Sequence, residues 1–431
     1  QSVTGANFLL TDSRPDGERQ APLKILLDCG LFQGPKIADD RNYAPFPYSL
    51  TVGILPSHLW ADVPPQSVAL SERILRPVGT GPFQFEKLKK AAFSGEIHEY
   101  RLVRNERYHG PAPLLDGVTF KFFSSTDDLV RALRRSEVGG VSLLPPSLVQ
   151  EAARARAVRI QRLGLPQYFA VFFNQAKSPP LSDLAVRRAL AGATDRERMI
   201  REALHGEASA VAAALPPGSA GTEPDLPTIP FDVERARQNL EEAGWKDADG
   251  NGMREKDGVP LAFSLVTSDW PEYVTSAKLL AEQWRAIGAD VSVQPATPGA
   301  MQADILRPRN YQALLYGEVL GADPDLYAFW HSTQTRDPGL NLSLFKARES
   351  DQLLEEARKI TDREARGRLY RKFQERLIQE VPAIFLYSPL YLYAVPKKLG
   401  GTFLERAPLP ADRFALVSSW HLKTRRVRKG K

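Results

Sequence analysis

The spacing of apolar residues between positions 174 and 395 predicts alternating helices and strands. Apolar side chains three or four positions apart indicate amphipathic helices, and short β-branched or aromatic runs indicate strands. The predicted helices lie near residues 182–204 (interrupted near Gly192), 232–244, 276–287, 350–360 and 363–380. The predicted strands lie near residues 261–266, 291–293, 313–316, 383–387 and 391–395. This alternation predicts an α/β lobe with a partly parallel sheet.

The part of the chain before residue 174 has a different texture, in which strands and turns dominate. Polar stretches separate its short apolar runs, and Ser125 or Thr126 is a suitable N-cap for one helix. The predicted elements are strands near 8–10, 23–27, 99–104 and 141–144 and a capped helix near 125–135. The glycines of residues 77–83 are not a phosphate-binding loop, because no Gly-Lys-Ser or Gly-Lys-Thr follows them.

Composition narrows the classes of protein that this chain can be. Its 431 residues predict two or three domains, and its 43% hydrophobic content is that of a soluble globular protein. The net charge of +6 equals the charge of the basic tail at 421–431, so a nucleic-acid-binding face over the main body is not indicated. Cys29 is the only cysteine, which excludes a disulfide scaffold. The sequence opens at Gln1 with no basic and apolar leader pattern, so we expect no signal peptide within these residues.

No pattern of catalytic residues emerges from the sequence. The six histidines lack metal-ligand spacing, and Cys29 has no base nearby in the sequence. Residues 247–252 match the first half of a calcium-binding loop, but the twelfth position is Gly258 rather than Glu. A polar hairpin turn is the favoured interpretation of that segment. We therefore predict a protein that is not an enzyme and has no catalytic residue, metal site or cofactor.

Aromatic and acidic residues near predicted strand ends are the candidates for a binding site. Tyr and Trp offer flat apolar faces with a polar atom, and they either line a cleft or belong to the core. An acid beside them could anchor a cationic ligand group, although Asp323 and Asp325 could equally cap a helix at 326–330. The predicted ligand-binding residues are Tyr316, Glu318, Asp323, Trp330 and Asn174.

A series of short motifs then carries a resemblance to a known family. The motifs lie at 52–58, 77–83, 173–174, 179–183, 186–190, 195–197, 215–218, 243–245, 249–252, 256–258, 323–325, 329–332 and 382–387. In this order, they make residues 52–420 resemble the family 5 extracellular solute-binding proteins. That family includes the oligopeptide- and dipeptide-binding components of ABC importers.

The resemblance implies a two-lobed periplasmic-binding-protein-like fold of type II that closes at a hinge over a peptide or peptide-like solute. It implies a first lobe at 52–173 plus 396–420, N-terminally incomplete, and a second lobe at 174–395, ahead of the tail at 421–431. It also implies a monomer that works with ABC importer membrane subunits, binds no nucleic acid and acts on the outer face of the cytoplasmic membrane. Peptide binders of this family often have an Asp where this chain has Leu320, and Glu318 is out of register with it.

Residues 1–49 resemble a different family, the β-CASP metallo-β-lactamase-fold RNA hydrolases. The matching stretches are residues 3–10, 24–34 and 41–48. The His-x-His-x-Asp-His metal motif that would follow in that family is absent, so no metal ligand is carried over. We therefore expect a chimera with a junction near residue 50. The alternatives to a solute-binding protein are a metal-dependent RNA hydrolase fragment and a non-functional chimeric product.

Overall fold

The chain forms two compact units in the computed structural model. The structure describes residues 7–11, 24–28, 54–55, 57–64, 67, 71–92, 95–123, 125–155, 157–216, 226–321, 324–404 and 410–422. The smaller unit comprises Gln1–Leu129, Lys398–Thr402 and Leu416–Lys431, and the larger comprises Val130–Lys397 and Phe403–Ala415. The lobe limits that the family resemblance implies stay a prediction.

The smaller unit contains short antiparallel sheets. Its strands are β1 (Asn7–Thr11), β2 (Lys24–Asp28), β3 (Ile54–Leu55), β4 (Phe83–Lys90), β5 (Ile97–Arg104), β6 (Gly117–Lys121), β16 (Leu399–Gly400) and β17 (His421–Leu422). Two one-turn helices, α2 (Ser57–Trp60) and α3 (Glu72–Leu75), accompany them. The strands predicted near 8–10, 23–27 and 99–104 are therefore confirmed. In the β4-β5-β6 sheet, the Phe85 and Tyr100 rings lie 5.2 Å apart, and the Tyr100 hydroxyl donates to the Leu75 carbonyl at 2.8 Å.

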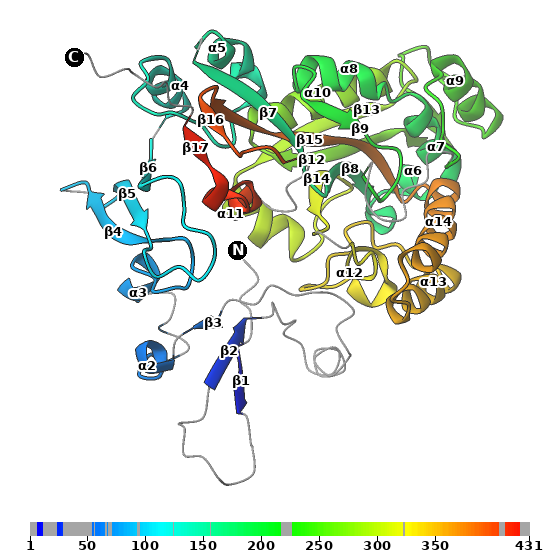
Figure 1. The fold of residues 1–431 in the computed structure, drawn as a ribbon. Helices are drawn as coiled ribbons and strands as arrows, with labels where there is room; N and C mark the ends of the chain where they lie inside the picture. The colour runs from blue at the N-terminus through cyan, green and yellow to red at the C-terminus, as the bar shows by residue number, and fades with distance from the viewer. Residues whose placement is uncertain are drawn as a thin grey trace, which may run out of the picture. The chain divides into compact units, whose positions relative to one another are not determined.

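A mixed sheet organises the larger unit, with strand order β13-β12-β14-β8-β15-β7 and β9 beside β15 (Figure 1). Its strands are β7 (Val158–Gly164), β8 (Gln167–Phe173), β9 (Ala208–Ala210), β12 (Ala262–Ser268), β13 (Asp290–Ala296), β14 (Ala313–Val319) and β15 (Ala383–Pro396). Strand β12 is parallel to β13 and β14, whereas β8 and β15 run antiparallel to their neighbours. The predicted α/β class with a partly parallel sheet is confirmed.

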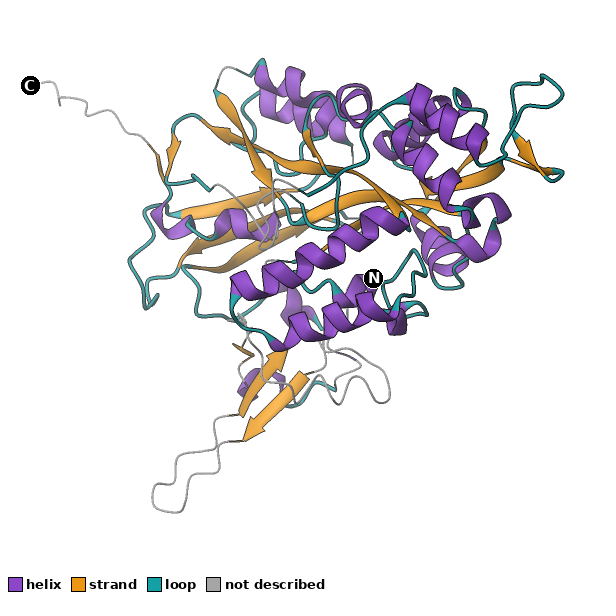
Figure 2. Ribbon diagram, turned by 90° about the vertical axis from the view of Figure 1, so that its right-hand side faces the viewer, coloured by secondary structure: helices purple, strands orange, loops and turns teal. Residues whose placement is uncertain are grey.

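Helices lie on both sides of this sheet (Figure 2). They are α5 (Val149–Ala153), α6 (Pro179–Ser182), α7 (Leu184–Gly192), α8 (Arg196–Ala203), α9 (Val233–Glu242), α10 (Pro271–Arg285), α11 (Pro298–Ala300), α12 (Tyr327–Trp330), α13 (Arg348–Lys359) and α14 (Arg363–Glu380). The predicted helix near 125–135 is α4 (Thr126–Arg134), and Ser125 accepts a hydrogen bond from the Asp128 amide at 3.1 Å. No helix in the described part of the chain is long and apolar enough to cross a membrane.

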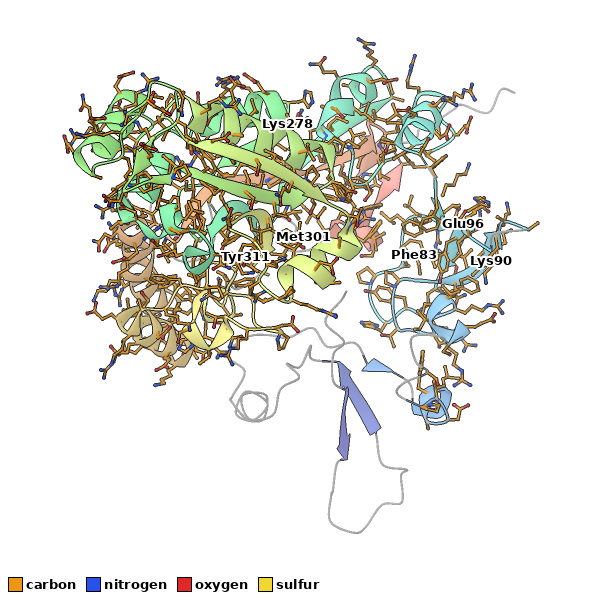
Figure 3. All side chains as sticks on the ribbon, turned by 180° about the vertical axis from the view of Figure 1, so that it is seen from behind. Phe83, Lys90, Glu96, Lys278, Met301 and Tyr311 are labelled. Atoms are coloured by element: carbon orange, nitrogen blue, oxygen red, sulfur yellow. The ribbon has the colours of Figure 1, made fainter. Side chains whose placement is uncertain are left out.

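Two hydrophobic cores occupy the two faces of the sheet, and strand β8 contributes to both. Phe169, Val171 and Phe173 enter the core formed with helices α7 to α10, whereas Tyr168 and Phe172 enter the core formed with α12 to α14. This alternation follows from the two-residue period of a β-strand. Figure 3 labels Met301 and Tyr311, which belong to the second core.

Three predicted element boundaries differ from the structure. The helix near 182–204 begins at Leu184, because the Asp183 carboxylate accepts a hydrogen bond from the Ala185 amide at 2.9 Å and caps α7. Its predicted interruption near Gly192 is confirmed: α7 ends there, and Asp195, which accepts from the Arg198 amide at 2.9 Å, caps α8. The strands near 383–387 and 391–395 are one strand, β15. The strand near 141–144 is reduced to a single bridge between Val141 and Ala394.

Hydrogen bonds from Arg187 link helix α7 to the residues between the end of α14 and the start of β15. Its side chain is buried, and its guanidinium donates to the carbonyls of Leu181, Ser182, Glu380 and Val381 at 2.9–3.0 Å. Burial lowers the pKa of this guanidinium, and the negative charges of Glu380 and Asp183 oppose that effect only in part. The four carbonyls take the place of water around the buried charge.

Replacing Arg187 by Met should destabilise the protein by at least about 3 kcal/mol, because buried carbonyls would lose their donors. Arg188→Met is the matched control: Arg188 is the next residue, is exposed and donates to the Gln379 carbonyl at 2.8 Å. We expect a loss of about 1 kcal/mol or less for the control. Urea unfolding midpoints of the two variants measure the difference, and equal midpoints would contradict this role of Arg187.

Candidate functional site

One end of the sheet in the larger unit combines strand ends with exposed apolar surface. The parallel strands β12, β13 and β14 finish there at Ser268, Ala296 and Val319, and Val319 pairs with Gln167 at the start of antiparallel β8. The direction of the strands therefore reverses between β14 and β8. Ligands of open α/β sheets commonly bind outside the carboxyl ends of strands, next to such a reversal.

A row of aromatic rings leads from solvent at this edge into the first core. Trp270 is 58% exposed at the start of α10 and lies 6.3 Å from the Tyr273 ring, which is 4.5 Å from the Phe169 ring. Phe169 in turn stacks on Tyr387 at 5.5 Å, and the Tyr387 hydroxyl is 2.9 Å from Ser276 Oγ. Burial raises the pKa of Tyr273 to about 12, so its hydroxyl is neutral at physiological pH. The row presents a rigid apolar surface with a Trp side chain at its outer end.

Gly317 of β14 is needed for this arrangement. A Cβ atom at this position would lie 2.7 Å from Cζ of the Phe169 ring, which is closer than van der Waals contact allows. Any larger residue would push Phe169 away from Tyr387 and Tyr273. The glycine therefore lets an aromatic ring cover the backbone of β14 just before the strand ends.

The opposite face of β14 carries a buried polar chain of three residues. The Tyr168 hydroxyl donates to Glu318 Oε2, and Trp330 Nε1 donates to the same hydroxyl at 3.3 Å. Glu318 and Trp330 are 4% and 1% exposed. The other carboxylate oxygen of Glu318 has no hydrogen-bond partner in the described part of the protein. The structure thus brings two of the five predicted residues together, inside the second core.

Burial controls the ionisation of Glu318. It raises the pKa of this carboxyl to about 8, and the Tyr168 hydrogen bond and the positive charge of Arg309 act in the opposite direction. A proton on the carboxyl removes the cost of holding an unpaired charge in the core. Glu318 is therefore mostly protonated at neutral pH.

The other predicted residues lie apart from this chain. Tyr316 is half-buried on β14, and its hydroxyl is hydrogen-bonded to Gln302. Asn174 is buried at the far end of β8, where its Nδ2 donates to the Arg309 carbonyl at 3.1 Å. Asp323 lies outside the described residues. The ligand-binding roles of all five residues stay predictions.

Both carboxylate oxygens of Asp325, which could equally cap the helix at 326–330, have partners within the protein. Its Oδ1 accepts from the Tyr327 amide at 3.2 Å at the start of α12, as a capping role requires. Its Oδ2 pairs with Arg358 at 3.1 Å, and that guanidinium lies 4.5 Å above the Tyr327 ring. These contacts fix the segment that leads into α12.

The segment that resembles a calcium loop is a polar turn. Asp247, Asp249 and Asn251 each accept a hydrogen bond from a backbone amide at 2.7–3.2 Å. The backbones of Lys246 and Glu255 pair across the base of the turn, just before the small hairpin of β10 (Glu255–Lys256) and β11 (Val259–Pro260). No group of three or more His, Cys, Asp or Glu residues in the described ranges is arranged to hold a metal ion.

Sequence reasoning did not find Trp270, Tyr273 or Gly317. The aromatic run 168–173 forms most of strand β8, and its residues lie in both cores. The sequence contains one local indication that Trp270 lies at a strand end. A large apolar residue stands there between the Asp that follows a strand and the Pro that begins a helix. The packing of Phe169 against Gly317 depends on strand pairing and has no local signal.

The family comparison agrees with this fold. The model of the bacterial extracellular solute-binding proteins, family 5 (middle part), matches residues 41–347. The chain belongs to this family, whose proteins bind solutes. The match begins at residue 41, before the predicted junction near residue 50.

Individual relatives cover most of this chain. It is 29% identical over 356 residues to the oligopeptide-binding protein AppA of Bacillus subtilis, covering 81% of this chain and 64% of that protein. It is 24% identical over 350 residues to the dipeptide-binding protein of Escherichia coli, covering 80% and 62%. The solved structure of B. subtilis AppA with a nonapeptide has a TM-score of 0.67 at 27% identity, with 86% and 72% covered. The chain thus spans less than two thirds of the length of these curated relatives.

Replacing Glu318 by Gln should change the pH dependence of stability. Between the ordinary pKa of 4.5 and the folded value of about 8, the native state binds more protons than the unfolded state. Wild-type stability therefore falls as pH rises through this window, by roughly 1.4 kcal/mol per pH unit at most from this group. Glu318→Gln should lack this fall, so its stability relative to wild type should increase from pH 5 to pH 9.

Urea unfolding at pH 5, 7 and 9 measures this change. Exposed Glu242 supplies the control, because Glu242→Gln should run parallel to wild type across the same range. Parallel curves for Glu318→Gln and wild type would show that Glu318 does not titrate in this window.

Proposed function

We propose that this protein is the solute-binding component of an ABC import system. It binds a peptide or peptide-like solute, closes at a hinge between two lobes and delivers the solute to the importer's membrane subunits. Ligand binding favours the closed state because that state makes the additional contacts. The first lobe comprises 52–173 plus 396–420, and the second comprises 174–395. The protein acts as a monomer on the outer face of the cytoplasmic membrane, without catalysis, cofactor or nucleic acid.

The proposal rests on the aromatic edge, which is the end of the sheet where the rings of Trp270, Tyr273, Phe169 and Tyr387 form a row. Trp270 exposes a large apolar ring beside the carboxyl ends of β12 and β14, and buried rings hold it in place from behind. A preformed apolar surface with few conformational options suits a ligand of variable side chains, because ordering it costs little entropy on binding. The relatives whose names describe oligopeptide and dipeptide binding support the same class of ligand.

Neither Glu318 nor the position of Leu320 offers a charge to the free amino group of a solute. Leu320, at the position where peptide binders of the family often have Asp, is buried and apolar. Glu318 faces Tyr168 and Trp330 inside the core, so it presents no charge to a ligand. Neither residue can pair with an ammonium group. The acidic candidates that remain are Asp323 and the two acids that flank Trp270, Asp269 and Glu272.

The resemblance of residues 1–49 to β-CASP hydrolases is a separate hypothesis, in which a chimeric junction lies near residue 50. A family 5 match that begins at residue 41 favours the solute-binding alternative for the chain as a whole. Sequencing genomic DNA across the codons around residue 50 tests the junction. If independent reads reproduce the junction, it is not an error of sequence assembly.

Replacing Trp270 by Ala should reduce peptide binding. In wild type, a mixed di- and oligopeptide library should raise the thermal unfolding midpoint by mass action. Trp270→Ala should lose most of this shift, because an exposed Trp at a binding surface typically contributes about tenfold or more in affinity. Phe231→Ala removes a ring of similar exposure, 52%, from the start of α9 and should keep the full shift. Equal shifts in both variants would place the site elsewhere.

Blocking the peptide amino group should change binding little. An N-acetylated copy of the same library should shift the unfolding midpoint about as much as the free library, since Leu320 offers the ammonium group no partner. A shift seen with the free library alone would mean that an acid, with Asp323 as the first candidate, recognises the amino terminus. The Asp323→Asn variant would then identify it.

A further inference from the structure

Strand β15 of the larger unit changes partners halfway along its length. Its first part, up to Tyr387, pairs with β8, and its second part, from Leu390, pairs with β7 (Figure 1). The short strand β9 pairs with the stretch between these parts. Strand β7 leads into β8 through Leu165 and Pro166, and β15 has a proline of its own, Pro389, where it changes partners. Because proline has no amide hydrogen, both chains lack a backbone donor at this point.

An ion pair connects β7 with the residue that precedes β9 at this point. Arg162 Nε and Nη2 donate to Glu207 Oε2 and Oε1, both at 2.7 Å. Arg162 lies opposite Leu392 in the pairing of β7 with β15, and the Glu207 carbonyl accepts from the Leu390 amide at 3.0 Å. Glu207 is therefore bound to β15 by its backbone and to β7 by its side chain. Two parallel hydrogen bonds between a guanidinium and a carboxylate also restrict the relative orientation of the two groups.

Glu207 depends on this pair more than Arg162 does. The side chain of Glu207 is 8% exposed, whereas that of Arg162 is 47% exposed. Water can hydrate an exposed arginine that has lost its partner, but a buried carboxylate that has lost its partner keeps an uncompensated charge. Any movement that separated the two residues would leave Glu207 in that state. Movements that keep the two groups together are therefore favoured.

The pair also joins the two lobes of the proposed function, on which this inference rests. Arg162 belongs to the first proposed lobe and Glu207 to the second. A rotation between lobes leaves groups near its axis in contact and moves groups far from its axis apart. We propose that the Arg162–Glu207 pair is the pivot of the hinge. It stays formed in the open and the closed conformation, and it limits the lobes to rotation about the point where β15 changes partners.

Distances between spin labels on the two lobes test this role without any solute. Ala153 in the first lobe and Glu242 in the second are exposed. Both are replaced by Cys and labelled, in a full chain that also carries Cys29→Ser. Pulsed electron paramagnetic resonance should give one narrow distribution of distances for this protein. Glu207→Gln should broaden the distribution, because a neutral amide cannot accept two charge-assisted hydrogen bonds from the guanidinium.

Glu202→Gln is the matched control. Glu202 pairs with Arg198 at 2.9 Å within helix α8, so this change breaks an ion pair inside one lobe. It should leave the distribution of distances unchanged. If Glu207→Gln does not fold, Arg162→Lys replaces it and should also broaden the distribution, because lysine keeps the charge but loses the paired donors. Circular dichroism and the unfolding midpoint establish folding of each variant.

Two results would overturn the proposal. A distribution that stays narrow in Glu207→Gln and Arg162→Lys would mean that the pair does not restrain the lobes. Equal broadening by Glu202→Gln would mean that the loss of any ion pair in this region loosens the fold. The distances are measured without peptide, so these outcomes are independent of solute binding. If Glu207→Gln broadens the distribution but the peptide library gives wild type no shift in its unfolding midpoint, only the solute-binding proposal fails.

Discussion

The structure of the larger unit depends on strand β8, which has to satisfy two hydrophobic cores at once. Six of its seven residues are buried, and both of its edges are hydrogen-bonded, to β14 and to β15. A strand in this position has no solvent-facing side, so each side chain must fit one core or the other. The fit fixes the register of β14, because a shift by one residue would exchange the contents of the two cores.

The features of the candidate site follow from that register. On one face of β8, Phe169 covers Gly317 and supports the row of rings that ends at Trp270. On the other face, Tyr168 holds Glu318 in the core. The same seven residues thus support an exposed apolar ring at the sheet edge and hold Glu318 inside the second core. The chemistry of this edge is set by strand pairing as much as by the residues that face solvent.

The sequence predicts those parts of the fold that have a local signal. Helices α9, α13 and α14 follow from the spacing of apolar residues, and the parallel strands follow from short apolar runs. Strand β15 was divided in the prediction because Ser388 and Pro389 interrupt its apolar run, whereas in the structure both residues pair with β9. The pairing of Tyr168 with Glu318 joins residues 150 positions apart, so no window of sequence contains it. Residue type alone selected Glu318 and Trp330, and it could not show that they face inward.

The two largely buried arginines beside the beginning of β15 have opposite hydrogen-bonding environments. Arg187 and Arg196 both reach this region, and both lose hydration there. Arg187 is surrounded by carbonyls, so its charge fastens α7 to the end of α14 and is fully used by the fold. Arg196 donates one hydrogen bond to the Phe385 carbonyl at 2.7 Å and stays partly exposed, so water can solvate the rest of its guanidinium.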